Sequence, residues 1–247
     1  MKPCYVTTSW DDGHPSDLRI AEMLARHNVP ATFYIPASSQ FERMDTAGIR
    51  ELGQTFEVGA HTLRHLRLNR LPDAEAAREI VGSKDYNEQL LGMPCTLFAP
   101  PGGRFGRAHL AMAEQAGFHG FRTTELMSLD HPKPYRGMAM MATTLQVFPH
   151  RPWAYWKNAL RHAKPVNLTV YLRHGRRGLI QAFESLLDRA IASGGVVHLW
   201  GHGWEIEERN EWNLLAGILE CLAERRSDVH LVSNSALCNL ALQNGHS

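Results

Sequence analysis

The sequence predicts an α/β protein built as a barrel of mostly parallel strands. Short apolar runs, rich in β-branched and aromatic residues, alternate with stretches whose apolar residues recur at helical spacing. About seven such strand–helix units follow one another, and this number favours a closed or nearly closed barrel over a short open sheet. Hydrophobic residues make up 44% of the 247 residues and charged residues 21%, which is typical of a packed globular protein.

The elements of the amino-terminal half follow from local pattern. Residues 5–10 form an apolar run that predicts a strand, and Leu18, Ala21 and Leu24 then recur at helical spacing. Pro72 suits the first turn of a long helix. Further strands are expected over residues 31–36, 56–60, 96–99 and 118–123. Helices are expected over residues 16–27, 46–52, 72–91 and 106–116.

The carboxyl-terminal half continues the alternation after one exception. Gly194 and Gly195 are a stop signal for a helix over 179–192, and Ser233 is a plausible cap for the closing helix. Strands are expected over 196–200 and 229–232, and helices over 212–223 and 233–242. The exception, residues 130–178, is rich in Pro, Arg, His and aromatic residues. We therefore expect a single domain over residues 1–247 with an irregular insertion around 130–178.

Composition excludes several classes of protein. The net charge of +1 gives no overall electrostatic attraction to nucleic acid or membranes. No apolar run has the length of a transmembrane segment. The first residues run directly into a strand, without the charged and apolar parts of a secretory signal. The four cysteines, Cys4, Cys95, Cys221 and Cys238, form no CxxC pair, so a zinc finger or redox dithiol is not expected. These observations favour a cytoplasmic location.

Reactive residues follow four of the predicted strands. Asp11 and Asp12 follow the first, where one carboxylate could hold a cation while the other handles a proton. His61 and His65 follow the third and, on a helical turn, would share a face and bind one ion. Each motif alone is more often an ordinary turn or surface histidine.

The other two motifs are the turn at 100–103 (PPGG), whose glycines could present an N–H to an oxyanion, and His202. In a parallel barrel the carboxyl ends of the strands converge on one face, where active sites form. The combined pattern therefore predicts a metal site at that face.

This set of motifs resembles the polysaccharide deacetylase family, also called the NodB-homology or carbohydrate esterase 4 group. The family motif T-F-D-D-G-P is similar to residues 9–14 (SWDDGH), and H-[ST]-x-x-H matches residues 61–65 (HTLRH) in full. The motif R-x-P-x-G is matched in part by residues 99–103 (APPGG), and L-x-H resembles residues 200–202 (WGH). The resemblance extends from Thr8 to about Glu205.

The resemblance implies a fold and a set of roles. The fold would be a distorted (β/α) barrel, commonly with seven parallel strands. Asp12, His61 and His65 would bind a divalent metal ion. Zinc is the first choice by ligand type, with cobalt, nickel, manganese and iron as alternatives. Asp11 would be the catalytic base and His202 the catalytic acid.

The turn and the last motif would form the substrate pocket. Pro101 and Gly102 would face the oxyanion, and Trp200 would line the pocket for the acyl group. Thr62 is expected to steady the histidine loop through its hydroxyl.

The departures from the family pattern concern the groups that support the base and the acid. Ala99 stands where the family often carries an arginine that orients the base, so Arg104 and Arg122 are the candidates for that charge. The family's fourth motif, an Asp near a Trp, has no convincing counterpart. Glu125 and Asp130 are weighed as partners of His202.

The leading hypothesis is a metal-dependent amidohydrolase that removes an N-acyl group, acetyl by preference, from an amino sugar. The substrate would be an N-acylated amino sugar or a nucleotide- or lipid-linked precursor in surface polysaccharide metabolism. The alternatives are a catalytically degenerate carbohydrate-binding protein on the same barrel and an iron oxygenase, since two histidines and a carboxylate also form an oxygenase triad. No pattern in the chain indicates an oligomeric state.

Overall fold

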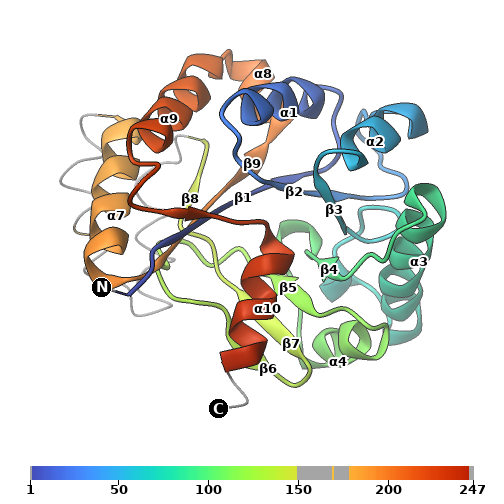
Figure 1. The fold of residues 1–247 in the computed structure, drawn as a ribbon. Helices are drawn as coiled ribbons and strands as arrows, with labels where there is room; N and C mark the ends of the chain where they lie inside the picture. Colours follow the sequence, from blue (N-terminus) through green and yellow to red (C-terminus); the bar gives the residue numbers. More distant parts are fainter. Residues whose placement is uncertain (1, 149–168, 170–177, 245–247) are drawn as a thin grey trace.

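The computed structural model describes residues 2–148, 169 and 178–244, and within them the chain forms one curled α/β sheet with helices around it (Figure 1). The strands are β1 (Tyr5–Asp11), β2 (Thr32–Ile35), β3 (Glu57–Ala60), β4 (Leu97–Phe98), β5 (Gly120–Arg122), β6 (Lys133–Tyr135), β7 (Met138–Met141), β8 (Leu145–Gln146), β9 (Val196–His202) and β10 (His230–Leu231). The α-helices are α1 (Asp17–Arg26), α2 (Thr46–Gly53), α3 (Asp73–Leu91), α4 (Arg107–Gln115), α7 (Leu179–Ser193), α8 (Gly203–Arg209), α9 (Trp212–Glu224) and α10 (Asn234–Asn244). Two 3-10 helices are η1 (Leu68–Arg70) and η2 (Pro101–Gly103).

The sheet is mostly parallel, as predicted. Its order is β6-β7-β5-β4-β3-β2-β1-β9-β8, with β10 paired to the start of β1 and β6 antiparallel to β7. Among the described residues no pairing joins β6 to β8, so the curled sheet forms a half-barrel rather than a closed seven-stranded barrel. The α/β barrel class is confirmed, and the sheet has ten described strands instead of seven.

β1 is an interior strand of the sheet and fixes the position of the site. It pairs with β2 on one side and with β9 on the other, in a register that sets Asp11 opposite both Tyr34 and His202. Side chains alternate along a strand, so Trp10 packs into the hydrophobic core while Asp11 points to the other face. The carboxyl ends of these strands therefore present polar side chains together.

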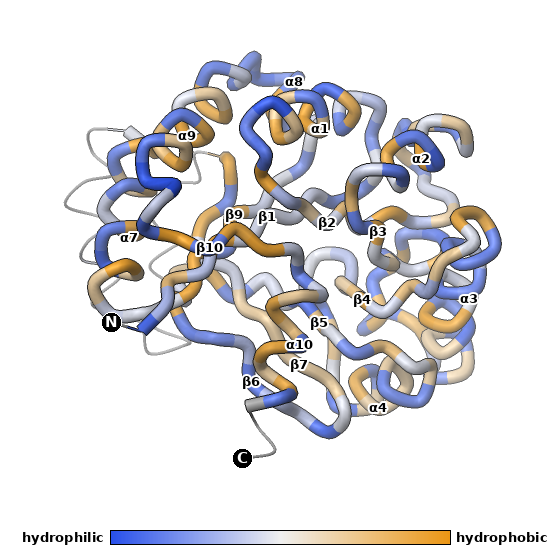
Figure 2. Tube along the Cα trace, in the orientation of Figure 1, coloured by the Kyte–Doolittle hydropathy of each residue, from blue (hydrophilic) through white to orange (hydrophobic). Residues whose placement is uncertain are grey.

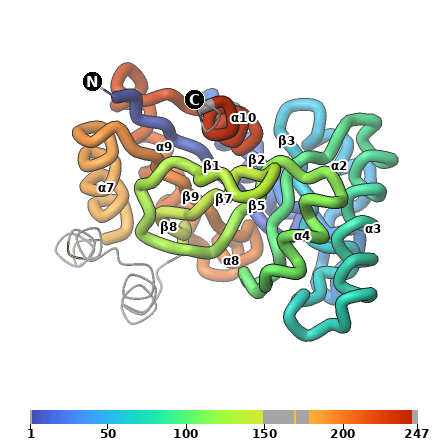
Figure 3. The backbone as a smooth tube through the Cα atoms, turned by 90° about the horizontal axis from the view of Figure 1, so that it is seen from below, coloured from blue at the N-terminus to red at the C-terminus, as the bar shows by residue number. Residues whose placement is uncertain are grey.

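The helices bury one face against the sheet. Figure 2 shows hydrophobic and hydrophilic residues alternating along α7 and α9, whose inward residues Phe183, Leu187 and Leu219 are buried. At the amino ends of the strands, α10 lies against β1 and β7 (Figure 3). Its Asn234 accepts a hydrogen bond from the Thr7 hydroxyl at 2.7 Å, so α10 packs at the end of β1 opposite to Asp11.

The expectation of an irregular insertion around residues 130–178 is corrected for the first part of that range. Residues 133–135, 138–141 and 145–146 are strands β6, β7 and β8 of the main sheet. The Pro-rich composition around 132–134 predicted a loop, whereas Pro134 lies on the edge strand β6, where proline is tolerated. The aromatic group at 153–156 lies outside the described residues.

Two further expectations bear on the whole chain. In the part of the chain that the structure describes, no helix has the length and apolar character needed to span a bilayer. All four cysteines are buried and free, as their apolar neighbours predicted for Cys4, Cys95 and Cys238. Burial raises the pKa of the Cys4 thiol to about 11, which makes it unreactive.

Candidate active site

Five of the predicted site residues meet at the carboxyl ends of the strands. Asp11 is the last residue of β1 and Asp12 follows it, His61 follows β3, and His202 ends β9. His65 reaches the same place from the loop after His61. The parallel register therefore brings together residues that are far apart in the sequence, such as Asp12 and His202, whose Oδ2 and Nε2 atoms are 3.9 Å apart.

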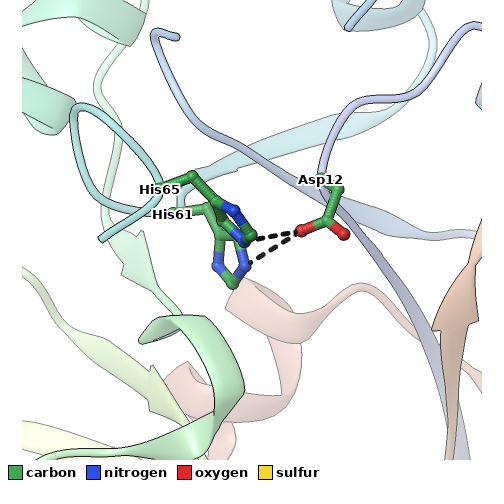
Figure 4. Close-up of side chains that lie close together, drawn as sticks. All are labelled: Asp12, His61 and His65. Atoms are coloured by element: carbon green, nitrogen blue, oxygen red, sulfur yellow. Dashed lines mark ion pairs between the residues drawn. The ribbon is translucent and has the colours of Figure 1, made fainter. Parts of the chain in front are cut away.

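Asp12, His61 and His65 form a possible metal site. Oδ1 of Asp12 lies 3.4 Å from Nε2 of His61 and 3.0 Å from Nε2 of His65 (Figure 4). One potential ligand atom from each residue lies within 4.8 Å of the others. Two imidazole nitrogens and one carboxylate oxygen suit zinc and other first-row transition ions, and leave coordination positions open.

The hydrogen bonds around His61 support this assignment. Its Nδ1 donates to the carbonyl oxygen of Ala99 at 2.7 Å, so in the neutral ring Nε2 carries a lone pair. That lone pair faces Oδ1 of the Asp12 carboxylate at 3.4 Å. Two electron-rich atoms facing each other in a buried site favour a cation between them.

The histidine loop, residues 61–67, differs from the expected helical turn. Thr62 and His65 both have left-handed backbone conformations, with φ of 62° and 57°. The loop is fixed instead by α3, because the backbone N–H of Arg64 donates to Oε2 of the buried Glu79 at 2.8 Å. The expected role of the Thr62 hydroxyl is not seen, since Thr62 Oγ1 is buried without a hydrogen-bond partner among the described residues.

Asp11 is held by Arg122. The last residue of β5, Arg122 is fully buried and donates to both carboxylate oxygens of Asp11. Its guanidinium lies 5.1 Å from the ring centre of Tyr34 and 5.0 Å from that of Trp200, so two aromatic faces enclose the charge. Of the two predicted arginines, Arg122 therefore reaches Asp11, whereas Arg104 is exposed and does not line the pocket.

His202 has a partner that sequence reasoning missed. Its Nδ1 lies 2.7 Å from Oε2 of Glu205, which also accepts a 2.7 Å hydrogen bond from the amide of Gln146. Burial lowers the pKa of His202, but Glu205, Asp12 and Asp11 outweigh it and raise the pKa to about 9. The imidazole is therefore protonated at neutral pH and can donate a proton. Glu205, rather than Glu125 or Asp130, is the carboxylate beside it.

Trp204 adds a contact to the possible metal ligand. Its indole N–H donates to Oδ2 of Asp12 at 2.9 Å, which leaves Oδ1 directed at the two histidines. Trp204 and Glu205 both belong to α8, which begins directly after His202. This short helix was not predicted, and it supplies two of the side chains that orient the site.

The site opens into a cavity of about 620 Å³, a size that accommodates a sugar. The expected pocket residues Pro101, Gly102 and Trp200 all line it. Other lining residues are Gln40, Phe41, Leu66, Arg67, Arg70, Leu71, Thr124 and Trp204. The turn at Gly102 has a left-handed backbone with φ of 62°, which favours glycine.

Comparison with known proteins relates the chain to one family. Residues 1–121 match the family model described as polysaccharide deacetylase. The matched residues, just under half of the chain, therefore resemble polysaccharide deacetylases in sequence. They include Asp11, Asp12, His61 and His65, whereas Arg122 and His202 lie beyond the match and are joined to the site by the fold.

Relatives and solved structures agree with this assignment. The chain is 26% identical over 115 residues to a peptidoglycan-N-acetylglucosamine deacetylase of Bacillus cereus, a stretch that covers 46% of this chain and 53% of that one. A putative polysaccharide deacetylase structure from Mycobacterium smegmatis matches with a TM-score of 0.72 and 14% identity, over 99% and 92% of the two chains. A chitin deacetylase structure from Colletotrichum lindemuthianum matches with a TM-score of 0.62 and 15% identity, over 96% and 88%. At these identities the structures establish the shared fold, and the chain spans about half of the curated relative.

Proposed function

We propose that this protein is a metal-dependent hydrolase that removes an N-acyl group, acetyl by preference, from an amino sugar. The observation that carries the proposal is the convergence of Asp12, His61 and His65 beside two further groups that are each held by a partner. Asp11 is held by Arg122 and His202 by Glu205. This arrangement supports three separate roles: a cation site at Asp12, His61 and His65, a base at Asp11 and an acid at His202.

Asp12, His61 and His65 would hold the divalent ion, with zinc as the first choice by ligand type. When bound, such an ion polarises the acyl carbonyl and favours ionisation of water. The fit is supported by the lone pair of His61 Nε2 and by Trp204, which leaves Oδ1 of Asp12 for the ion. Cobalt, nickel, manganese and iron would suit the same donors.

The protein's own groups would handle the protons. Asp11 would accept a proton from the water that attacks the acyl carbon, and Arg122 would hold its carboxylate in place. The carbonyl oxygen becomes negative as the new C–O bond forms, and a backbone N–H near Gly102 would face it. His202 would then give its proton to the nitrogen as the C–N bond breaks, which releases the free amine and the carboxylic acid.

The substrate class follows from the family and the cavity. The names of the relatives concern acetylated amino-sugar polymers, and the cavity accommodates one sugar ring with its acyl group. A polymer end or a nucleotide- or lipid-linked precursor would present the same N-acyl sugar. The cytoplasmic location is a separate proposal, which the four buried free thiols support.

The direct test is amine release from N-acetylglucosamine and its oligomers, before and after chelation and after metal is restored. We expect activity that chelation abolishes and zinc or cobalt restores. Asp12→Ala should be inactive, whereas Asp228→Ala, which removes an exposed carboxylate outside the pocket, should keep the wild-type rate. Full activity of Asp12→Ala would overturn the proposed role of the ion.

The alternative of a degenerate carbohydrate-binding protein has less support. Such a protein would have no use for a base and an acid that each lie beside a matching partner, and the buried charges of Asp11 and Arg122 are costly to keep. Calorimetric binding of an N-acetylated sugar without turnover, unchanged in Asp11→Ala, would favour the alternative. Detectable hydrolysis would exclude it.

A further inference from the structure

Two arginines of the site cavity have no acidic partner among the residues that the structure describes. Arg67 and Arg70 both line the cavity and are exposed to solvent. Arg67 directly precedes the 3-10 turn η1 and Arg70 is its last residue, and the backbone N–H of Arg70 donates to the carbonyl oxygen of Arg67 at 3.0 Å. The buried Leu68 anchors this turn, so both arginines line the cavity from the same short segment of the chain.

The carboxylates of the cavity are engaged elsewhere. Asp11 is paired with Arg122, and Asp12 faces His61 and His65. In the described part of the chain, no Asp or Glu oxygen lies within 4.0 Å of the guanidinium of Arg67 or Arg70. The undescribed stretches 149–168 and 170–177 contain Arg and Lys but no Asp or Glu, so they supply no side-chain carboxylate for these two charges.

Arg67 also lies next to the turn that would face the acyl group. A Cβ atom placed on Gly102 would lie 3.3 Å from Nε and 3.7 Å from Cζ of Arg67. The guanidinium is therefore close to where the sugar's acyl group would sit.

We propose that Arg67 and Arg70 bind an anionic group, a carboxylate or a phosphate, carried by the amino sugar whose acyl group is removed. The inference rests on the proposed function and narrows its substrate class. Guanidinium groups bind both anions through paired N–H donors, so one site serves either chemistry. Specificity of this kind distinguishes the protein from a deacetylase of neutral polymers.

The test compares three substrates that differ in charge: N-acetylglucosamine, N-acetylmuramic acid with a carboxylate, and N-acetylglucosamine 1-phosphate. We expect kcat/KM of the wild type to favour at least one anionic substrate by about tenfold, the effect of one charge-assisted hydrogen bond. Arg67→Gln/Arg70→Gln should lose that preference, so that its kcat/KM for the anionic sugars falls to the value that the same variant shows for the neutral sugar. Arg107→Gln, which removes an exposed arginine outside the cavity, should behave as the wild type.

A metal ion also attracts anions, so the decisive result is the dependence on the two arginines. Equal or better turnover of the neutral sugar by the wild type would overturn the inference, as would an anionic preference that survives in the double variant. The same three sugars are titrated calorimetrically into metal-loaded Asp11→Asn protein with and without the two arginines. If no sugar is hydrolysed, the proposed function fails, and this arm still decides whether the arginines bind the anion.

Discussion

Asp11 and Arg122 depend on each other because both are buried at the end of the barrel strands. Arg122→Met should leave the carboxylate without its cation, and we expect a loss of about 3–5 kcal/mol in the free energy of unfolding, with loss of deacetylation. Urea denaturation measures the first effect. In Asp11→Asn/Arg122→Met most of the stability should return while activity stays absent. If Arg122→Met had the same free energy of unfolding as the double variant, this interdependence would be contradicted.

Trp204 acts on the proposed metal through Asp12. Trp204→Phe keeps an aromatic ring but removes the N–H that holds Oδ2 at 2.9 Å. We expect the affinity for zinc to fall by about tenfold, in the range for the loss of a hydrogen bond to a metal ligand. Competition with a chromophoric chelator measures this affinity. Unchanged affinity, with the protein folded, would show that the bond does not orient the ligand.

Glu205 is the positioning residue for His202. Glu205→Gln removes the charge that faces Nδ1 of His202 and keeps the size of the side chain. We expect kcat to fall by about 10- to 100-fold, as for the loss of efficient proton transfer, with little change in KM or metal content. A rise in KM at constant kcat would instead point to a role in substrate binding.

Some residues of the site could be predicted from the sequence and others could not. The pairs Asp11–Asp12 and His61–His65 were predictable, because each follows a strand and parallel strands bring such positions together. The choice of Arg122 over Arg104 needed the structure, although its place at the end of a strand was a usable signal. Glu205 lies three residues after His202, but this spacing signals a partner only once a helix is known to begin there.

At the scale of elements, the histidine loop is fixed by α3 rather than by its own conformation. Glu79 is buried and binds both the backbone and the guanidinium of Arg64, whereas Glu75 binds the same guanidinium from a more exposed position. Glu79→Gln should therefore weaken metal affinity by about tenfold, because the loop that carries His65 loosens. Glu75→Gln is the matched control and should bind metal as the wild type does. Equal effects of the two changes would rule out anchoring by Glu79.

The helices and strands also differ in how well the sequence predicted them. α1, α3 and α9 were predicted to within a few residues. α1 and α9 bury mainly apolar residues, whereas most of the buried residues of α3 are polar. β8 and β6 were missed, since strands of two and three residues with proline nearby carry no periodicity. The left-handed residues Thr62 and His65 were missed for another reason, because contacts with α3, distant in sequence, impose them.

For the whole molecule, the buried His198 links stability to pH. Burial and the charge of Arg122 lower its pKa to about 3, against 6.5 for a free imidazole. Between these values the unfolded chain binds a proton that the folded chain excludes, so stability should fall as the pH falls. One such proton changes the free energy of unfolding by about 1.4 kcal/mol per pH unit.

His198→Asn offers a direct comparison, because its amide can still donate to the carbonyl of Ala142. Urea denaturation at several pH values from 6.5 down to about 3 should give a flatter dependence for this variant than for the wild type. Parallel curves for the two proteins would contradict a neutral, buried His198.

The central claim is that the folded chain gathers Asp12, His61 and His65 around one divalent ion. Calorimetric titration of zinc into chelator-treated protein tests it most directly, with His65→Ala and Asp228→Ala in parallel. The account predicts one tight site per chain in the wild type and in Asp228→Ala, and the loss of that site in His65→Ala. Equally tight binding by His65→Ala, or no binding by the folded wild type, would contradict it.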